Sequence, residues 1–418
     1  MNLSRFGQSF GPDAGIVQLM DDLGQAAAVN RDMLMLGGGN PGQIPQLQQR
    51  FRARMQQILD DGQTFDRLVG QYGSPQGHPQ FIEALALLLA DELGWPVTAR
   101  NVALTNGSQS ASFMLFNMLG GSDAQGRPRR ILLPLTPEYI GYADQGAEPN
   151  LFVSSRAHIE LLGETQFKYR VDFDAVRVDA GIAAICVSRP TNPTGNVLTD
   201  QEIGTLRDLA ATHRIPLIID SAYGLPVPGI VFVAAAPVWD ENVIVCMSLS
   251  KLGLPGVRTG IIIACPEIIR AITGMNAIMN LTTGGFGPEL ALDMVQSGDI
   301  LRLSRDVVRP FYERKALAAV ARLEHDLAGV PFRIHRPEGA IFLWLWFPGL
   351  PMSARALYER LKARGVLIIP GHHFFPGLAQ DWPHRHECIR VNYSQDDERV
   401  HAGLRIIADE VRQAFARG

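Results

Sequence analysis

The chain has 418 residues, a length that suits two domains better than one small core. Apolar residues make up 46% and charged residues 19%, the composition of a globular enzyme, and the formal net charge of -4 gives no general attraction for nucleic acid or an anionic membrane. We therefore expect small-molecule partners, with no nucleic acid and no membrane among them.

The cysteines and the apolar runs bear on the compartment. Four cysteines lack C-x-x-C spacing, and three of them fall inside apolar runs, which is typical of buried thiols in a reducing compartment: Cys186, Cys246, Cys265 and Cys388. No segment approaches 18 uninterrupted apolar residues. Residues 1–22 carry acidic, Gly and Pro positions where a signal peptide needs an apolar core. The expectation is a cytoplasmic protein.

The first 300 residues alternate between helical patterns and short β-branched runs. In chain order, these patterns predict helices at 79–93 and 109–119, strands at 130–134, 151–154 and 182–188, a helix at 200–213, and strands at 216–220, 243–247 and 260–264. Near-continuous apolar strands joined by helical crossovers predict an α/β fold, with a mainly parallel sheet covered on both faces.

After about residue 300 the pattern changes to an α+β arrangement. A long helix at 300–327 precedes a strand at 341–347, a helix at 354–364, strands at 366–369 and 388–393, and a helix at 396–415. We expect a large domain over residues 46–300 and a smaller domain made of residues 1–45 and 301–418, with the long helix as connector.

Three polar residues fall at the ends of predicted strands. Asp220 closes Pro-Leu-Ile-Ile-Asp, Asn192 follows the strand that ends at residue 188, and Lys251 follows Val-Ile-Val-Cys-Met. In an open parallel sheet, ligands collect beyond the carboxyl ends of the strands. The three strand ends therefore present a carboxylate, an amide and an amine to one crevice.

Lys251 lies in a Gly/Pro-bounded loop that also carries the hydroxyls of Ser248 and Ser250. A lone lysine after a strand is most often a solvated surface charge. The alternative is a Schiff-base lysine, which needs a fixed, partly desolvated position and a cofactor that bears a carbonyl group.

Asp220 and Tyr223 also admit two interpretations. An Asp at a strand end is often a helix cap or turn former, and a buried Tyr can simply pack on the sheet. In the functional interpretation, Asp220 pairs with a protonated pyridine nitrogen and makes the ring an electron sink. The hydroxyl of Tyr223, or the amide of Asn192, would then bind the phenolate oxygen of the cofactor.

The segment Thr105-Asn-Gly-Ser-Gln precedes a helical pattern and predicts a phosphate site. Gly107 allows close backbone approach, and the amides of Ser108 and Gln109 would face the phosphate at the helix N-terminus. A plain serine-rich helix cap is the competing interpretation. Ser248, Ser250 and Arg258 are candidates to complete the phosphate cup.

Arg390 interrupts an apolar strand pattern in the predicted small domain. It is either an edge-strand charge or a bidentate clamp for a substrate α-carboxylate, for which Arg is better suited than Lys. The backbone of Gly39, in a turn near the other end of the chain, could approach the same carboxylate.

The ordered motifs resemble those of the class I/II aminotransferases of fold type I. They are Tyr72, Gly107-Ser-Gln, Tyr139, Asn-Pro-Thr-Gly at 192–195, Asp220-x-x-Tyr223, Ser248-x-Ser-Lys251, Arg258 and Arg390. The resemblance implies pyridoxal 5'-phosphate as cofactor, amino-acid and 2-oxo-acid substrates, and a homodimer with shared active sites. It also implies a seven-stranded, mainly parallel sheet between helices in the large domain, beside a smaller α+β domain.

The resemblance also implies a role for each matching residue. Lys251 would carry the Schiff base and then move the substrate proton, and Asp220 and Tyr223 would be catalytic with it. The remaining assignments are ring stacking by Tyr139, phosphate binding by Gly107, Ser108, Gln109, Ser248, Ser250, Arg258 and a second subunit's Tyr72, phenolate binding by Asn192 and Tyr223, and α-carboxylate binding by Arg390, Asn192 and Gly39.

The sequence differs from the best-known members of this family in the phosphate loop, and its side-chain pocket also lacks a residue that some members have. Lys251 and Arg258 are seven positions apart (258 − 251), one fewer than in many members, which predicts a tighter loop. No clear second Arg is available for a dicarboxylate side chain, whereas three apolar residues could line a pocket: Phe6, Ile16 and Phe374. An aliphatic substrate is therefore favoured.

Four stretches narrow the resemblance to family members that exchange an amino group between valine and pyruvate. They are Leu-Gly-Gly-Gly-Asn-Pro, Pro-Glu-Tyr-Ile-Gly-Tyr-Ala-Asp, Ser-Lys-Leu-Gly-Leu-Pro-Gly and the segment 337–347. His372 and His373, in a loop expected to face the site, lack partners at metal-ligand spacing and are interpreted as pocket wall or structure, with no metal.

Other functions must be distinguished from transamination between valine and pyruvate. A C–S or γ-lyase on the same scaffold is the first, because fold alone does not fix the reaction, and an aminotransferase of other aliphatic or broad specificity also stays open. A ligand-sensing regulator would need an added basic DNA-binding domain, of which the sequence shows no trace. A dinucleotide-dependent oxidoreductase would need a G-x-G-x-x-G motif after the first strand of a βαβ unit.

Overall fold

The computed structural model describes residues 2–8, 17, 24 and 32–417. Its main sheet has seven principal strands in the order β2-β11-β10-β9-β8-β4-β5, and the two-residue strand β3 adds an antiparallel edge pair on β4. All principal neighbours are parallel except where β11 pairs with β10 and β2. The bounds are β2 Val102–Thr105, β3 Gly121–Ser122, β4 Pro128–Thr136, β5 Phe152–Arg156, β8 Ile182–Ser188, β9 Leu217–Asp220, β10 Val243–Ser248 and β11 Gly260–Ile263.

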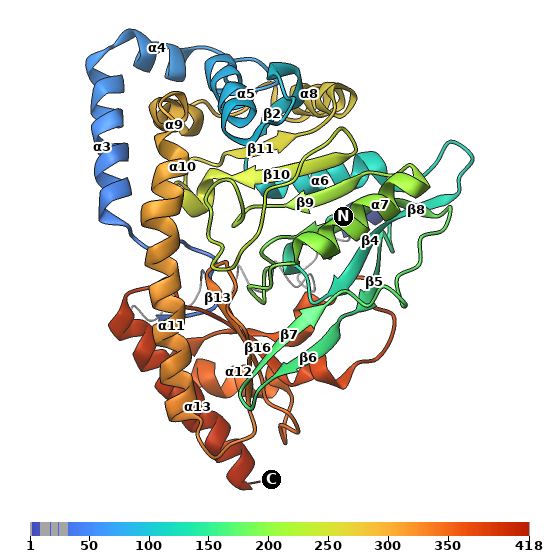
Figure 1. Cartoon of the computed structure of the whole chain (residues 1–418), viewed down its shortest axis with the longest axis vertical. Helices are drawn as coiled ribbons and strands as arrows, with labels where there is room; N and C mark the ends of the chain where they lie inside the picture. The colour runs from blue at the N-terminus through green and yellow to red at the C-terminus, as the bar shows by residue number, and fades with distance from the viewer. Residues whose placement is uncertain (1, 9–16, 18–23, 25–31, 418) are drawn as a thin grey trace.

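Helices cover both faces of this sheet, because alternate side chains of its apolar strands are buried on opposite sides. Ile218 and Ile244 pack with α6 (Ser108–Leu119) and α8 (Pro266–Asn280) on one face. Ile219 and Val245 join the core on the other face with α5 (Pro79–Leu93) and α7 (Asp200–His213). The remaining helices of the upper part in Figure 1 are α3 Pro45–Asp60, α4 Gln63–Gly70 and α9 Phe286–Gln296, and short α1 is Arg5–Gln8.

The predicted long helix at 300–327 is interrupted in the structure. It consists of α10 (Asp299–Leu303), a π-helical segment η4 (Ser304–Val308) and α11 (Arg309–Asp326), which packs against α13 (Asp397–Arg417) in the lower part of Figure 1. The Ser304 hydroxyl donates to the carbonyl oxygen of Ile300 at 2.8 Å, a side-chain bond of the kind that competes with the regular helix ladder.

A second sheet of six strands forms the lower part of the molecule in Figure 1. Its order is β15-β16-β13-β12-β7-β6, with bounds β6 His158–Leu162, β7 Gln166–Arg170, β12 Arg333–His335, β13 Phe342–Trp346, β15 Ile369–Pro370 and β16 Cys388–Asn392. The hairpin β6–β7 belongs to this sheet although its residues lie within the 46–300 range. Helices α12 (Ala354–Ala363) and α13 (Asp397–Arg417) pack here, and β1 (Leu34–Met35) pairs with β14 (Val366–Leu367).

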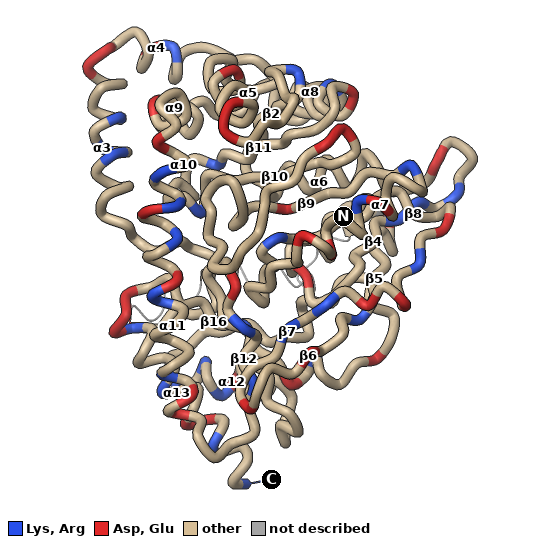
Figure 2. The backbone as a smooth tube through the Cα atoms, in the orientation of Figure 1, with Lys and Arg blue, Asp and Glu red and all other residues tan. Residues whose placement is uncertain are grey.

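A buried ion pair joins the hairpin to the rest of the molecule. Lys168 on β7 has 1% of its side chain exposed, and its ammonium pairs with Glu338 and donates to Asn196 at 2.9 Å. Elsewhere charges of both signs are interspersed along the backbone (Figure 2). No helix in the described part of the chain is long and apolar enough to cross a membrane.

Candidate active site

A cavity of about 640 Å³ lies where the carboxyl ends of the main-sheet strands meet residues from both ends of the chain. Its described lining contains most of the predicted site positions, their polar neighbours and a few apolar residues. They are Gly38, Gly39, Asn40, Ser108, Gln109, Tyr139, Ser188, Asn192, Asp220, Tyr223, Ser248, Ser250, Lys251, Arg258, Arg390 and Gln395, with Met35, Ile140, Pro190, Ala222, Pro255 and Gly24.

Lys251 stands on the short 3-10 helix η3 (Leu249–Leu252), which begins directly after β10. The Ser248 side chain caps this turn by accepting a backbone N–H at 3.1 Å. The Lys251 ammonium nitrogen donates to the carbonyl oxygen of Gly39 at 2.5 Å and lies 5.1 Å from the centre of the Tyr223 ring. No carboxylate pairs with it within the described chain, so its amine faces the cavity.

The surroundings of Lys251 favour the neutral amine. Burial and, to a smaller extent, the positive charges of Arg390 and Arg258 lower its pKa to about 8, while the negative charge of Asp220 opposes them. At pH 7 roughly a tenth of such an amine is unprotonated, far more than for a solvated lysine. The neutral form is the nucleophile that attacks a carbonyl group.

Asp220 closes β9, and its carboxylate is held from two sides. Its Oδ2 accepts from the Tyr142 hydroxyl at 2.7 Å, and its Oδ1 accepts from the backbone N–H of Ala222 at 2.9 Å. Burial raises the pKa of Asp220, whereas these two donors and the Lys251 charge lower it. A cationic group placed against this carboxylate would favour its ionised form.

The N-terminus of α6 and the loop after η3 form a second polar wall. Gly107 precedes α6 with φ +92, and a Cβ atom on it would lie 2.2 Å from the Arg258 guanidinium, so only glycine fits. Arg258 itself takes a left-handed backbone with φ +51. This turn brings the guanidinium to the cavity despite the short seven-residue spacing from Lys251.

Arg390 on β16 is buried, with 2% of the residue exposed, and it links three segments of the chain. Its guanidinium donates to Asn192 Oδ1 at 2.6 Å and to the carbonyl oxygen of Gly37 at 2.7 Å, and lies 4.1 Å from the centre of the Phe342 ring. Its Nε has no hydrogen-bond partner. An anion entering the cavity would satisfy this group.

These walls fit pyridoxal phosphate. A nucleophilic amine, a carboxylate on the cavity wall, an aromatic ring at Tyr139 and a glycine-lined helix N-terminus beside an Arg match the aldehyde, ring nitrogen, ring face and phosphate of that cofactor. The cavity also has room for a substrate beside it, since ligand sites are typically about 300–1,000 Å³.

The pKa of Lys251 predicts how cofactor uptake depends on pH. Because the attacking form is the neutral amine, the rate at which apoprotein takes up pyridoxal phosphate should rise about tenfold per pH unit below pH 8 and level off above it. Stopped-flow absorbance of the bound cofactor measures this rate. A flat profile between pH 6 and 9 (roughly two units below to one above that pKa) would contradict the prediction.

Several predicted positions lie outside the cavity wall. Tyr72 is 83% exposed and does not reach the cavity of its own subunit. Phe374 is fully buried and packs behind Arg390, 5.1 Å from its guanidinium, so it does not line a side-chain pocket as predicted. Phe6 is 40% exposed on α1 and also lies off the wall, and Ile16 falls outside the described residues.

The histidine pair does not form the pocket wall either. His372 and His373 lie on η5 (Gly371–Phe374), their rings 4.1 Å apart, and His372 stacks on His386. Burial lowers the pKa of His372 to about 3 and also lowers that of His373. In the described ranges no three His, Cys, Asp or Glu residues are arranged to hold a metal ion.

Sequence reasoning missed Tyr142, which donates to Asp220, and two polar residues that lie behind it, Glu138 and Ser188. Tyr142 and Glu138 stand in the stretch 137–144 already quoted for the resemblance, but no role was predicted for them. Ser188 ends β8 and lines the cavity. The signal available was the placement of Ser188 at the end of β8 and of Glu138 two residues after β4.

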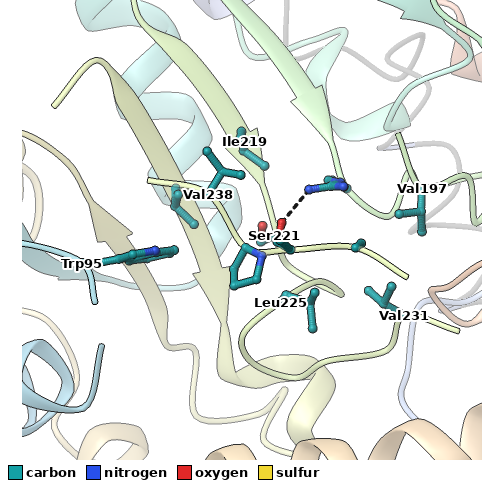
Figure 3. A pocket seen from close by; sticks show the side chains of 12 residues that line it. Trp95, Val197, Ile219, Ser221, Leu225, Val231 and Val238 are labelled. Carbon is teal, nitrogen blue, oxygen red and sulfur yellow. Dashed lines mark hydrogen bonds between the residues drawn. The ribbon is translucent and has the colours of Figure 1, made fainter. Parts of the chain in front are cut away.

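A smaller hollow lies apart from the cavity and is too small for a substrate (Figure 3). Trp95, Leu225 and Val238 line its apolar part, and its volume is about 20 Å³, room for about one water molecule. The dashed contact in Figure 3 is the bond from the Arg189 guanidinium to the carbonyl oxygen of Ala236 at 2.8 Å.

Comparisons with known proteins identify the family of the chain. Residues 32–407 match the family described as aminotransferase class I and II. The chain is 51% identical over 416 residues to the valine–pyruvate aminotransferase of Escherichia coli K12, covering 100% of this chain and 99% of that protein.

Two solved structures are similar over nearly their whole length. A putative amino-acid aminotransferase from Psychrobacter arcticum has a TM-score of 0.97 and 45% identity, and covers 100% of both chains. The valine–pyruvate aminotransferase of Salmonella typhimurium LT2 has a TM-score of 0.89 and 50% identity, and covers 97% of this chain and 100% of that one. The chain belongs to the class I and II aminotransferases, which are pyridoxal-phosphate enzymes of fold type I.

Proposed function

We propose that this enzyme transfers the amino group of valine to pyruvate, giving 3-methyl-2-oxobutanoate and alanine. The observation that carries the proposal is 51% identity, over essentially the full length of both chains, to a protein that bears this activity in its name. The described lining of the cavity supports the proposal in two ways. Its two Arg residues, Arg258 and Arg390, are assigned to the phosphate and the α-carboxylate, so none remains for an acidic side chain, and the wall includes the apolar residues Met35 and Ile140. A branched aliphatic side chain suits such a surface.

Pyridoxal phosphate, when bound, takes the amino group from one substrate, passes it to the next, and spreads the charge that develops on the substrate carbon. In the proposed arrangement Asp220 holds the ring nitrogen, and Asn192 and Tyr223 hold the phenolate oxygen. Tyr139 stacks on the ring. The phosphate is bound by Gly107, Ser108, Gln109, Ser248, Ser250 and Arg258.

The remaining residues act on the substrate. Arg390 binds the α-carboxylate with Asn192, and the Gly39 backbone closes over it. Lys251 moves the proton at the substrate α-carbon, for which an amine with a pKa of about 8 is well matched to neutral pH. The same pocket would then accept pyruvate, so kinetics of the ping-pong type are expected.

A panel of amino donors against pyruvate tests the proposal. Alanine formation should be fastest with valine and other aliphatic donors and negligible with aspartate, for which the described wall offers no further Arg. A lyase on this scaffold would instead release ammonia or a thiol without consuming pyruvate. Release of that kind, with no alanine formed, would reject the proposed function.

Arg390 provides a test of the carboxylate site. Replacing it with Lys keeps one positive charge but loses the planar fork, so kcat/KM for both substrates should fall about 10- to 100-fold, mainly through KM. Steady-state kinetics measure the change. Arg399→Lys is a matched control, because Arg399 donates to the Met33 carbonyl oxygen away from the cavity. Equal effects of the two variants would contradict the assignment.

We also propose a cytoplasmic homodimer in which Tyr72 binds the cofactor phosphate of the other subunit. Tyr72 is 83% exposed, and Val69, Ile278 and Leu281 are also large apolar side chains that are exposed in the single subunit, as is typical of residues that an interface covers. Light scattering should give a dimer, and Tyr72→Phe should weaken cofactor binding about threefold to tenfold through one lost hydrogen bond. A monomer that retains full cofactor affinity would refute the shared site.

A further inference from the structure

Glu138 is a buried carboxyl group for which the described residues provide no cation as a partner. It follows β4 and is 0% exposed. Three neutral groups lie within hydrogen-bond distance: the Ser188 backbone nitrogen is 2.9 Å from Oε1, and the Ser188 hydroxyl and the Tyr139 backbone nitrogen are 2.6 and 3.2 Å from Oε2. In the described chain Glu138 takes part in no ion pair. A buried carboxylate without a cation is costly, so the site favours the neutral acid.

From Glu138 the polar contacts continue to Asp220. The Ser188 hydroxyl lies 3.3 Å from the Tyr142 hydroxyl, which donates to Asp220 Oδ2 at 2.7 Å. Tyr142 is 1% exposed, and its ring is held edge-on by Phe116 at 5.1 Å. The contacts therefore form one path from Glu138 to the cavity wall.

The order of protons along this path depends on Glu138. If Glu138 were ionised, the Ser188 hydroxyl would donate to it and would have no proton for Tyr142. If Glu138 is protonated, it donates to Ser188, Ser188 donates to Tyr142, and Tyr142 donates to Asp220. Only when Glu138 is protonated do all the hydrogen bonds of the path point in the same direction, towards Asp220. Successive hydrogen bonds that point the same way polarise and strengthen one another.

We propose that Glu138, as a neutral acid, is a positioning residue that heads a hydrogen-bond chain through Ser188 and Tyr142 and so keeps Asp220 ionised. The inference rests on the proposed function, because Asp220 is taken to pair with the cofactor ring nitrogen. With one carboxyl neutral, Asp220 is the single anion of the path and does not face a like charge.

The surrounding titratable groups favour the same state. Burial, with a smaller contribution from the negative charge of Asp220, raises the pKa of Glu138 to about 8 against the hydrogen bonds from Ser188, which lower it. Cys186 on β8 and Tyr142 also face this path, and burial raises the pKa of both well above their usual values, which leaves them neutral. Below about pH 8 Glu138 is the protonated member of the two carboxyl groups.

The chain acts on the proton shared by Asp220 and the ring nitrogen. Each donor to Asp220 makes its carboxylate less basic, so the shared proton stays on the ring nitrogen. Removing the Tyr142 or Ser188 hydroxyl should make Asp220 more basic and draw the proton towards it. An amide at position 138 can donate to Ser188 as the neutral acid does, so Glu138→Gln should preserve the chain.

The experiment loads the holoenzyme with pyridoxal phosphate labelled with ¹⁵N in the ring and follows the ring-nitrogen signal against pH. Ser188→Ala and Tyr142→Phe should lower the fraction of protonated ring nitrogen and raise the cofactor dissociation constant about tenfold, the effect of about one hydrogen bond. Glu138→Gln should keep the wild-type signal. Infrared difference spectra of wild type against Glu138→Gln at about pH 6 should show one protonated carboxyl group in the wild type only.

Controls separate the possible failures. Ser304→Ala removes a buried serine hydroxyl outside the path and should leave the ring-nitrogen signal unchanged. Tyr142→Phe keeps the ring that packs on Phe116, so a folding failure of Ser188→Ala would not prevent the test. If Asp220→Asn leaves the ring nitrogen unchanged, the proposed cofactor orientation fails and the inference with it. If Asp220→Asn changes the signal but Tyr142→Phe does not, or if Glu138→Gln changes it, the chain alone is overturned.

Discussion

Replacing Lys251 with Ala should abolish transamination, lowering kcat by about 10⁴-fold or more, because one change removes both the group that anchors the cofactor and the group that moves the substrate proton. None of the other lysines can replace it. Lys168 and Lys315 pair with Glu338 and Asp397, and Lys362 lies over the Tyr358 ring on α12. The measurement is alanine formation from valine and pyruvate, together with the visible absorption of bound cofactor.

The matched control is Lys362→Ala, which removes a lysine away from the cavity. It should keep both the visible absorption and the turnover. The Lys251→Ala protein should still fold, since its side chain makes one hydrogen bond, to the Gly39 carbonyl oxygen. Normal turnover in the Lys251→Ala protein would remove the basis for the proposed site.

The second large effect is expected from Asp220→Asn. The carboxamide keeps the shape of the side chain but carries no charge to hold a protonated ring nitrogen, so kcat should fall about 10²- to 10³-fold, the range for losing a preorganised electrostatic group. The cofactor should remain attached to Lys251, so its visible absorption persists while turnover is lost. Steady-state rates and absorption spectra on the same samples measure the two properties.

Asp208→Asn controls for the loss of one acidic group, because Asp208 lies on α7 with 79% of its side chain exposed. It should leave kcat within about twofold, since surface charges of this kind contribute little. An Asp220→Asn protein with the kcat of this control would show that the ring nitrogen needs no carboxylate partner here.

The sequence predicted the parts of the fold that local patterns determine. The helices at 79–93 and 200–213 and the strand at 182–188 agree with α5, α7 and β8 residue for residue. Their apolar periodicity and, for α7, the capping box of Thr199 with Glu202 define them locally. The four-residue strand β2 was not predicted.

Two further features of the secondary structure were not predicted from the sequence, the hairpin β6–β7 and the interruption at η4. The hairpin β6–β7 was missed because Lys168 interrupts the apolar pattern of β7, and its burial depends on Glu338, 170 residues later. The interruption at η4 was missed because Ser304 is compatible with an ordinary helix. In the hairpin a contact across the fold overrides the local pattern, whereas at η4 the Ser304 hydroxyl bonds within its own helix, to Ile300.

The same division holds for the candidate site. The strand-end argument predicted Lys251, Asp220 and Asn192 from the sequence, and all three line the cavity. The contact of Glu138 with Ser188 could not be predicted, since it depends on how the loop after β4 lies against the end of β8. Arg390 and Gly37 meet across 353 residues, and only the tertiary structure shows it.

The position of β7 in the second sheet has a consequence for biosynthesis. Its partner β12 is made more than 160 residues later, as the pairing of Gln166 with Ile334 shows. Until that segment leaves the ribosome, the nascent chain exposes one unpaired edge of the hairpin, with the apolar face of Phe167 and the unsatisfied charge of Lys168. A chain released before residue 333 should therefore aggregate. The yield of folded protein then depends on how well the exposed edge of β7 is shielded during synthesis.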